Sequence, residues 1–487
     1  MDDVLECDVC ILGAGIAGLN ALFAVSRRLP AGQKIALVDR RDTPAGMWHE
    51  VYDYVRLHQP HPMFTAGNIA WQGQTDPHYL ANKREVVDHL QRCFQVLRER
   101  TQLEPRLGHE YLGHEDVGSG ERPITVRCRR VADGAEVTIR ARRLIKAFGY
   151  DVKPADPLKL TSKAVVSLSP DHCNLLGPEV TQAAGDVYVV GGGKTGMDTA
   201  HTLVQRARGT TVRMLIGAGT IFLNRDLATP RGFRRHWDGS TTLELFLDVA
   251  GRFDGHNEVE TMAYFRRKYG VAVDDECRRF MFGVLSPQEN QEIRSGVAEI
   301  IRDHLVDVID GADGPEMVLR SGARRPMKPG SVVLNATGYV GQSRPAYEPY
   351  LSATGNVLSI QPTSTTHFLS SQAAYFLTHL FITGELASLP LYEVDVAELR
   401  DASRDAFPAA AIALTLYNTS VIINRLPRWV MNENGLDFLL LFPVHRRLLA
   451  LVKLLRFLKR RPDHLRKVMD SVRERFGVRL GPIRAVP

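Results

Sequence analysis

The chain opens with a regular succession of apolar and polar segments. An unbroken apolar run from Val9 to Leu12 predicts a short strand buried on both faces. A glycine-rich turn follows, and residues 19–29 then carry apolar side chains at helical spacing. A second apolar run, 34–38, predicts another buried strand, which ends at Asp39. Strand, turn, helix and strand in this order predict a β-α-β unit with a parallel sheet.

The turn inside this unit has the spacing G-x-G-x-x-G. Gly13 permits the tight turn, Gly15 lets the backbone approach a pyrophosphate, and Gly18 lets the helix pack close to the strand. A carboxylate at the end of the second strand can accept hydrogen bonds from a ribose. The pattern therefore predicts dinucleotide binding, for which we select Gly13, Gly15, Ile16, Ala17, Gly18, Asp39 and Arg40.

The same pattern returns in the middle of the chain. Residues 186–207 read as strand, glycine turn and helix, and residues 210–216 read as the next strand. This internal repeat predicts a second dinucleotide site, in which Lys194 can also reach a phosphate. The residues selected in this turn are Gly191, Gly193, Lys194, Thr195 and Gly196.

The second unit differs from the first at the position that contacts the ribose. Asp39 lies 26 residues after Gly13, whereas the same step from Gly191 reaches Gly217. A site without a carboxylate there does not repel a 2′-phosphate, and Arg213 and Arg225 are near enough in sequence to pair with one. We therefore expect NADPH rather than NADH; the alternative is that both arginines are ordinary surface charges.

The remaining segments complete a two-unit architecture. Residues 79–100 predict an amphipathic helix, two strands flank the turn at 131–134, and residues 143–150 read as a further strand. Residues 226–305 read as a mostly helical insertion that can shape a pocket or an interface. Strands up to residue 339 are expected to return the chain to the first unit. This gives a first domain at 1–160 and 325–400, a second at 161–324, and a helical region at 401–487.

Charge is concentrated in that last region. From Leu441 onward there are 13 lysines and arginines against 3 acidic residues, while the whole chain carries only +6. The body therefore offers no basic surface for nucleic acid. A leucine stripe bordered by cations predicts a helix that lies on an anionic membrane, and the alternative is a helix packed on the body. The stripe consists of Leu448, Leu451, Leu455 and Leu458.

Cysteines and apolar runs bear on the compartment. Cys7 and Cys10 form a C-x-x-C string inside the first strand, where core thiols are expected rather than a redox pair. The scattered cysteines, the acidic N-terminus and the lack of 18 uninterrupted apolar residues favour a cytoplasmic protein without a signal peptide or membrane span. The histidines have no metal-ligand spacing, so no metal is expected.

Two dinucleotide sites in one chain imply electron transfer between two cofactors. The sequence resembles the class B flavin-dependent monooxygenases, which include flavin-containing and Baeyer–Villiger enzymes, over about residues 5–225 and 325–390. The segments that carry this resemblance are GAGIAG, Asp39, Gly46-Met47-Trp48, AFGY at 147–150, GGGKTG, and ATGY at 336–339. The resemblance implies FAD in the first unit, NADPH in the second, and an NADP domain inserted in the FAD domain, all with Rossmann-like α/β folds.

The same resemblance implies roles for individual residues. It places Gly46, Met47 and Trp48 beside the flavin, and Arg56, His58 and Gln59 near the reactive ring as hydrogen-bond donors. Gly338 belongs to the second strand-end motif. Gly384 and Glu385 resemble a turn that binds the ribityl chain.

The resemblance implies a monooxygenase that forms a hydroperoxyflavin and oxygenates a small, apolar organic substrate with O2. One family fingerprint, F-x-G-x-x-x-H, is absent; in the corresponding region, 165–177, only His172 can replace its histidine. Two alternatives therefore stay open. One is an NADPH-dependent flavin reductase or oxidase that inserts no oxygen. The other is a non-catalytic, membrane-associated adaptor built on a flavoprotein fold.

Overall fold

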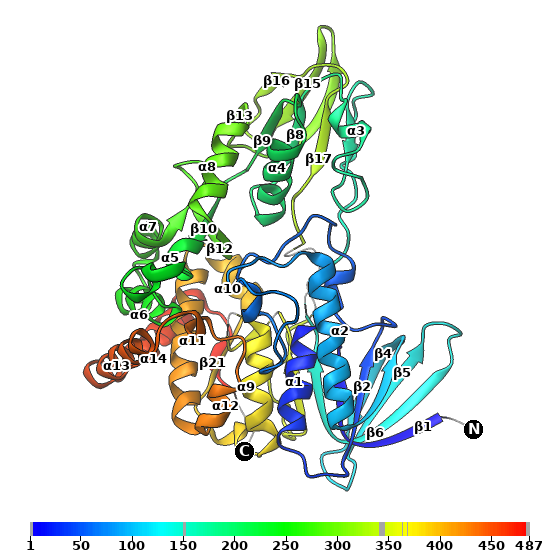
Figure 1. Cartoon of the computed structure of the whole chain (residues 1–487), viewed down its shortest axis with the longest axis vertical. Helices are drawn as coiled ribbons and strands as arrows, with labels where there is room; N and C mark the ends of the chain where they lie inside the picture. The colour runs from blue at the N-terminus through cyan, green and yellow to red at the C-terminus, as the bar shows by residue number, and fades with distance from the viewer. Residues whose placement is uncertain (1–2, 150–151, 340–345, 363, 368, 484–487) are drawn as a thin grey trace.

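The computed structural model describes residues 3–149, 152–339, 346–362, 364–367 and 369–483. Tyr150, the last residue of the AFGY motif, lies outside these ranges. Two large sheets, the first mixed and the second parallel, occupy the two ends of the molecule in Figure 1, each with its own helices, and a helical region extends to one side. The expected α/β class with two Rossmann-like units is confirmed.

The first sheet has the strand order β3-β2-β1-β6-β5-β4, with β18 beside β6. β1 pairs in parallel with both β2 and β6, as the opening pattern predicts. Its strands are β1 Asp3–Leu12, β2 Lys34–Asp39, β3 Gln102–Leu107, β4 His109–Asp116, β5 Ile124–Arg130, β6 Glu136–Ala147 and β18 Val357–Ile360.

The structure corrects one detail of this sheet. Residues 136–147 form the single strand β6 rather than a hairpin arm followed by a separate strand. Its first half pairs antiparallel with β5 and its last four residues pair in parallel with β18. One long strand therefore carries both the hairpin and the chain's return to the first unit.

Three helices pack against this sheet, with α1 between α2 and α9 (Figure 1). They are α1 Ile16–Ser26, α2 Lys83–Arg100 and α9 Ser370–Ile382. α2 begins later than the expected residue 79 because Asn82 and Glu85 form a capping box at its N-terminus. Its predicted apolar face, with Val86, Leu90 and Phe94, is buried.

The second sheet has the order β13-β9-β8-β17-β7, and all its pairs are parallel. β8 Val187–Val190, α4 Lys194–Arg206 and β9 Val212–Leu215 form the predicted repeat. The other members are β7 Val166–Leu168, β13 Glu299–Ile301 and β17 Val332–Asn335, with α3 Pro178–Thr181 and α8 Pro287–Gly296 nearby.

The expected domain boundary at 325 is wrong for one strand. β17 pairs with β8 in the second sheet, so the chain returns to the first sheet only at β18. An antiparallel meander precedes β17, namely β14 Leu305–Gly311, β15 Gly314–Leu319 and β16 Arg324–Pro326. An apolar strand pattern could not show which of two similar sheets it joins.

The insertion is less helical than expected. It contains α5 Arg225–Ala228, the 3-10 helix η3 Gly232–His236, α6 Thr242–Arg252 and α7 Glu258–Tyr269. It also contains β11 Gly270–Val271 and β12 Arg279–Leu285, which form a small sheet with β10 Thr220–Asn224. Because β12 is apolar and pairs with β10, it is fixed close to the end of β9.

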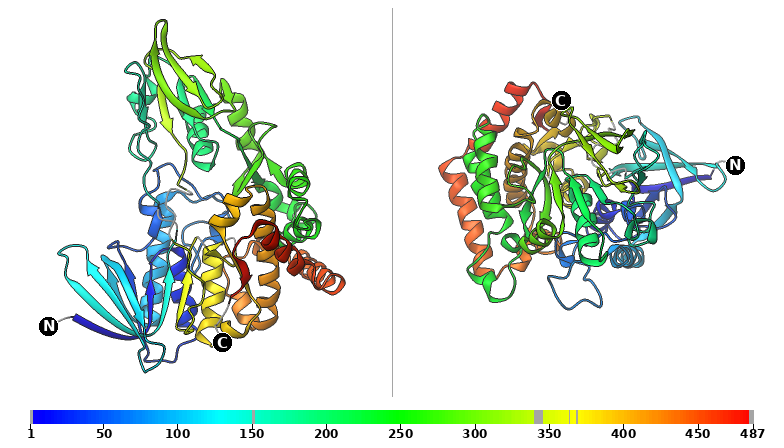
Figure 2. Two further views of the ribbon diagram at one scale, coloured as in Figure 1. Left: turned by 180° about the vertical axis from the view of Figure 1, so that it is seen from behind. Right: turned by 90° about the horizontal axis from the view of Figure 1, so that it is seen from above.

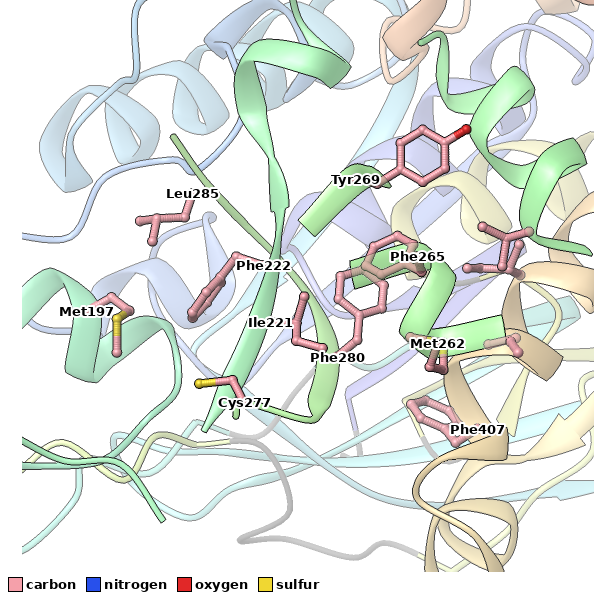
Figure 3. Packing of buried hydrophobic residues seen from close by; sticks show 14 of the residues in the cluster. Met197, Ile221, Phe222, Met262, Phe265, Tyr269, Cys277, Phe280, Leu285 and Phe407 are labelled. Carbon is pink, nitrogen blue, oxygen red and sulfur yellow. The ribbon is translucent and has the colours of Figure 1, made fainter. Parts of the chain in front are cut away.

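The C-terminal helices share a core with the insertion. They are α10 Val396–Ala402, α11 Ala406–Arg425, α12 Arg428–Asn432, α13 Val444–Arg460 and α14 His464–Phe476. Figure 3 shows Phe407 of α11 facing the side chains of Met262, Phe265 and Phe280 from the insertion. A small sheet of β19 Ser364–Thr365, β20 Tyr392–Asp395 and β21 Leu480–Pro482 holds the end of the chain.

Within the described residues, α11 is the one helix long and apolar enough to cross a membrane, yet 78% of its apolar window is buried inside the protein. Its composition is explained by burial on several sides.

Candidate functional site

The backbone packs so closely around the first glycine turn that two of its glycines cannot be replaced by a larger residue. Gly13 has a φ of +103°, and a Cβ there would lie 2.6 Å from the Ala147 carbonyl oxygen. A Cβ on Gly18 would lie 1.7 Å from the Gly13 carbonyl oxygen. Gly15 differs, because a Cβ there meets only Gly46 Cα at 3.5 Å. The fold needs glycine at Gly13 and Gly18, whereas Gly15 is left for the approach of a ligand.

Asp39 and the Gly46-Met47-Trp48 segment are both attached to this turn. The Ala14 amide donates a 2.6 Å hydrogen bond to Asp39 Oδ2, and the Arg41 amide donates to Oδ1 at 2.9 Å. The Ala45 amide donates to the Ala14 carbonyl at 3.1 Å, which fixes the following 3-10 helix η1 Gly46–His49 on the turn. The predicted cradle and the predicted flavin-side segment are therefore one connected structure.

The second turn repeats the geometry of the first. Gly191 has a φ of +142°, and a Cβ there would lie 2.1 Å from the Ala336 carbonyl oxygen. A Cβ on Gly196 would lie 2.0 Å from the Gly191 carbonyl oxygen, while a Cβ on Gly193 meets no atom within 4 Å. Ala147 and Ala336 thus occupy equivalent positions. The motifs AFGY and ATGY resemble each other because each lies at the end of a strand that packs against one glycine turn.

A single cavity of about 1350 Å³ contains both turns. Ligand pockets usually measure about 300–1,000 Å³, so this one has room for more than one small molecule. From the first unit, the predicted residues that line it are Gly13, Gly15, Ile16, Ala17, Asp39, Arg40, Gly46, Met47, Trp48, His58 and Gln59. From the second unit they are Gly191, Gly193, Lys194, Thr195 and Gly338.

The loop after η1 connects the two units. Tyr52 donates a 2.7 Å hydrogen bond to Asp198 Oδ2 on α4, and Tyr54 and Thr199 share one of 2.6 Å. Lys194 forms an ion pair with the same Asp198. The loop of the first unit therefore sets the distance between the two turns.

His58 lies on this loop and is held as a neutral imidazole. The Val284 amide donates to His58 Nδ1 at 3.3 Å, which leaves the proton on Nε2. Burial, assisted by the charges of Lys194 and Arg225, lowers the pKa of His58 to about 3. Near neutral pH, His58 is a hydrogen-bond donor and not an acid.

Gln59 has an acceptor that the protein does not satisfy. Its Oε1 is buried and has no hydrogen-bond partner among the described residues, and the residue lines the cavity. An unpaired buried acceptor costs about 1–3 kcal/mol. A ligand with an N–H group, such as a carboxamide or a flavin ring, would remove this cost.

Arg56 is not in the cavity, which corrects the prediction for it. The residue is exposed, and its Nη1 donates to the Leu80 carbonyl at 3.0 Å and to Tyr79 Oη at 3.4 Å. His58 and its neighbour Gln59 line the cavity, whereas Arg56 does not.

The two arginines expected at a 2′-phosphate form ion pairs with carboxylates of the protein instead. Arg213 donates to Asp186 at 2.8 Å and to Glu299 at 2.6 Å. Arg225 is buried, donates to the His58 carbonyl at 2.9 Å and pairs with Glu289 at 2.8 Å. Neither lines the cavity, so both predictions are corrected. Proximity in sequence to the end of β9 did not determine the direction of these side chains.

Another group of cations occupies the expected place. Gly217 follows β9, and a Cβ on it would lie 2.5 Å from the His304 ring. His304, Arg279, Arg320 and Arg404 all line the cavity. His304 precedes β14, Arg279 begins β12, Arg320 follows β15 and Arg404 follows α10. Because these positions are far apart in the chain, no local sequence pattern revealed them.

These cations are close enough to influence one another. Burial lowers the pKa of Arg279, and the Arg404 and Arg320 charges lower it further while Asp405 opposes them. The pKa of His304 is lowered by burial and by the same three arginines, against Asp303. Among the described residues, none of the three guanidinium groups has a hydrogen bond or an ion pair. An anionic group would relieve their mutual repulsion.

Gly384 and Glu385, which resemble a ribityl-binding turn, do not line the cavity. Both residues follow the C-terminus of α9, and Glu385 forms an ion pair with Arg425. The cavity instead receives Gln361 and, at the start of α9, Ser370 and Ser371. The helix N-terminus, with its unpaired N–H groups, is the end that suits an anion or a polyol.

The site therefore fits two dinucleotides. Each turn leaves open the one glycine position at which a pyrophosphate must approach, and each lies at the N-terminus of its helix. All six cysteines lie in the described part of the chain, and none of them lines the cavity.

Comparisons with known proteins agree with this geometry. Residues 7–230 match the family model described as pyridine nucleotide-disulphide oxidoreductase. The uncharacterized protein Rv2000 of Mycobacterium tuberculosis is 25% identical over 369 residues. That match covers 70% of this chain and 62% of the relative, so the chain spans less than two thirds of that protein's length.

Among solved structures, an open crystal structure of cyclohexanone monooxygenase superposes with a TM-score of 0.51 at 14% identity, over 88% of this chain and 99% of that one. The chain therefore shares the fold of that enzyme. A flavin-containing monooxygenase from Stenotrophomonas maltophilia is also similar, with a TM-score of 0.47 at 15% identity, over 79% of this chain and 99% of that one. The family match supports a pyridine nucleotide as one cofactor.

Proposed function

We propose that this protein is a monooxygenase that uses FAD in the first site and NADPH in the second. The observation that carries the proposal is the single cavity lined by both glycine turns. A hydride can pass from one cofactor to the other only if both reach a common space. The stoichiometry is one NADPH, one proton, one O2 and one substrate, giving NADP⁺, water and the oxygenated product.

FAD, when bound, supplies the activation of oxygen, and the chain supplies the surroundings that protect it. Apolar side chains cover the cavity wall next to the first turn: Met47, Trp48, Val51 and Phe64. Trp48 is 9% exposed and meets Phe64 edge to face with 5.5 Å between the rings. Such a wall excludes water from the reacting atoms and favours a small apolar substrate.

Oxygen transfer is tested by labelling. We expect the purified protein to be yellow, to oxidise NADPH, and to place ¹⁸O from ¹⁸O2 into an apolar ketone or thioether, measured by mass spectrometry. A yellow protein that instead releases one hydrogen peroxide for each NADPH with every substrate is an oxidase. A colourless protein that consumes no NADPH is the adaptor.

The loop residues give a second expected result. Gln59→Leu removes the unpaired acceptor and should lower kcat/KM for NADPH about tenfold, because one hydrogen bond to a bound cofactor is lost. Arg56→Leu is the matched control on the same loop, and its kinetics should stay within about twofold of wild type because Arg56 lies outside the cavity. Steady-state kinetics measure both. A larger loss for Arg56→Leu would contradict the placement.

A further inference from the structure

Exposed apolar side chains gather on one side of the molecule. Half of the large apolar residues that are exposed in the described chain belong to α13, to the 3-10 helix η5 Phe438–Leu441 before it, or to the η3 region of the insertion. We call this surface the α13 face. It consists of Phe233, Trp237, Leu440, Val444, Leu448, Leu449, Val452 and Leu455.

α13 is apolar on two opposite sides. One side is buried against α6 through Ala450 and Leu454, with Phe457 beside them. The other side carries Leu448 at 58% and Leu455 at 51% exposure. The stripe expected from the sequence is thus divided, because Leu451 and Leu458 pack on the core. A helix with a second, solvated apolar side differs from the usual surface helix, whose outer side is polar.

The two largest exposed aromatic residues lie next to the start of α13. Phe233 is 81% exposed and Trp237 is 67% exposed. The rings of His236 and His445 stack with 5.5 Å between their centres. Arg446 donates to the carbonyls of Asp238 and Gly239, both at 3.0 Å. These contacts fix the η3 region to α13. Figures 1 and 2 show α13 at the outer edge of the molecule.

α13 itself carries cations and no aspartate or glutamate. Arg456, Lys459 and Arg460 on its last turns are exposed, and no ion pair joins them to another described residue. A two-fold contact between copies would gather the cations of both copies in one interface without an acid on the helix to pair them. An anionic lipid surface complements both the apolar side chains and the charges.

We propose that the α13 face docks on the surface of an anionic phospholipid membrane. Leu448, Val452 and Leu455 enter the boundary between headgroups and acyl chains. Trp237 and Phe233 anchor beside them at headgroup level, where aromatic side chains are favoured. Arg456, Lys459 and Arg460 contact lipid phosphates. The proposal does not depend on the reaction, because the α13 face lies outside the cavity.

The test is flotation of the full-length holoprotein with vesicles of phosphatidylcholine, alone or mixed with phosphatidylserine. Wild type should float with the mixed vesicles and should not bind the vesicles of phosphatidylcholine alone. The double variant Leu448→Asp/Leu455→Asp should bind at least about tenfold less, since two apolar anchors become anionic. Val117→Asp/Val131→Asp is the matched control, because both residues are exposed valines away from α13.

Tryptophan fluorescence gives a second measurement of docking. The emission of Trp237 should shift to the blue when mixed vesicles are added, and this shift should vanish in Trp237→Leu. All variants should oxidise NADPH at the wild-type rate. Equal binding of wild type and the α13 double variant overturns the proposal. So does a dimer without lipid, seen by sedimentation velocity, that the double variant converts to a monomer. If wild type does not oxidise NADPH at all, the proposed function is wrong, but the vesicle-binding result still stands.

Discussion

Gly15→Ala should give a folded protein that has lost most of its yellow colour. The fold tolerates a methyl group at Gly15, whose nearest neighbour would be Gly46 Cα at 3.5 Å. The backbone conformation at Gly15, with a φ of −79°, is open to alanine. The methyl group would instead occupy the space in which the pyrophosphate meets the turn. We expect at least about a tenfold loss of flavin affinity, read from the flavin absorbance per protein after purification.

Gly193→Ala is the matched variant in the second turn. A Cβ there meets no protein atom within 4 Å, so the fold should again be unaffected. This variant should stay yellow, whereas its KM for NADPH should rise at least about tenfold. Gly481→Ala, in β21, also has open space and should change neither quantity. If Gly193→Ala loses the yellow colour and Gly15→Ala instead raises the KM for NADPH, the assignment of FAD to the first unit is wrong.

Arg279→Gln/Arg404→Gln should abolish the preference for NADPH over NADH. Both arginines line the cavity, which also contains Gly217, where the ribose of the second dinucleotide is expected. Each charge-assisted hydrogen bond to a phosphate contributes about 1.5–3 kcal/mol, so the KM for NADPH should rise about 100-fold. The KM for NADH should change little, since that cofactor has no 2′-phosphate. Steady-state kinetics with both cofactors measure this.

Arg213→Gln is the control for that experiment. Arg213 lies between Asp186 and Glu299, so its loss leaves the buried Asp186 with fewer partners. We expect lower thermal stability and an unchanged ratio of NADPH to NADH efficiency. If Arg213→Gln alone removes the preference, or if the double variant weakens both cofactors equally, the arginine cluster is not the phosphate site.

The sequence was informative wherever chemistry depends on neighbours in the chain. Gly13, Gly15 and Gly18 act within one turn, and Asp39 ends the strand that follows, so spacing alone located the first cradle. The same holds for Gly191, Gly193 and Gly196. The segment Gly46-Met47-Trp48 was found by resemblance, and its attachment through Ala45 and Ala14 explains why it accompanies the turn.

The sequence was misleading wherever direction or partner choice decides the outcome. Arg56 is two residues from His58, yet His58 lines the cavity and Arg56 is exposed outside it. Arg213 and Arg225 are near the end of β9 in sequence, but carboxylates on other segments hold them. Gly384 and Glu385, selected by resemblance, lie after the C-terminus of α9, whereas Ser370 and Ser371 at its N-terminus line the cavity.

By itself, the sequence therefore determined two nucleotide-binding units, their repeated turns and the carboxylate of the first, because periodicity and glycine spacing are local properties. Tertiary structure alone decided that both turns open into one cavity, that Arg279, Arg320 and Arg404 gather around His304 beside Gly217, and that β17 belongs to the second sheet. These features join residues far apart in the chain. Only packing of the insertion and the C-terminal helices against the two units brings them together.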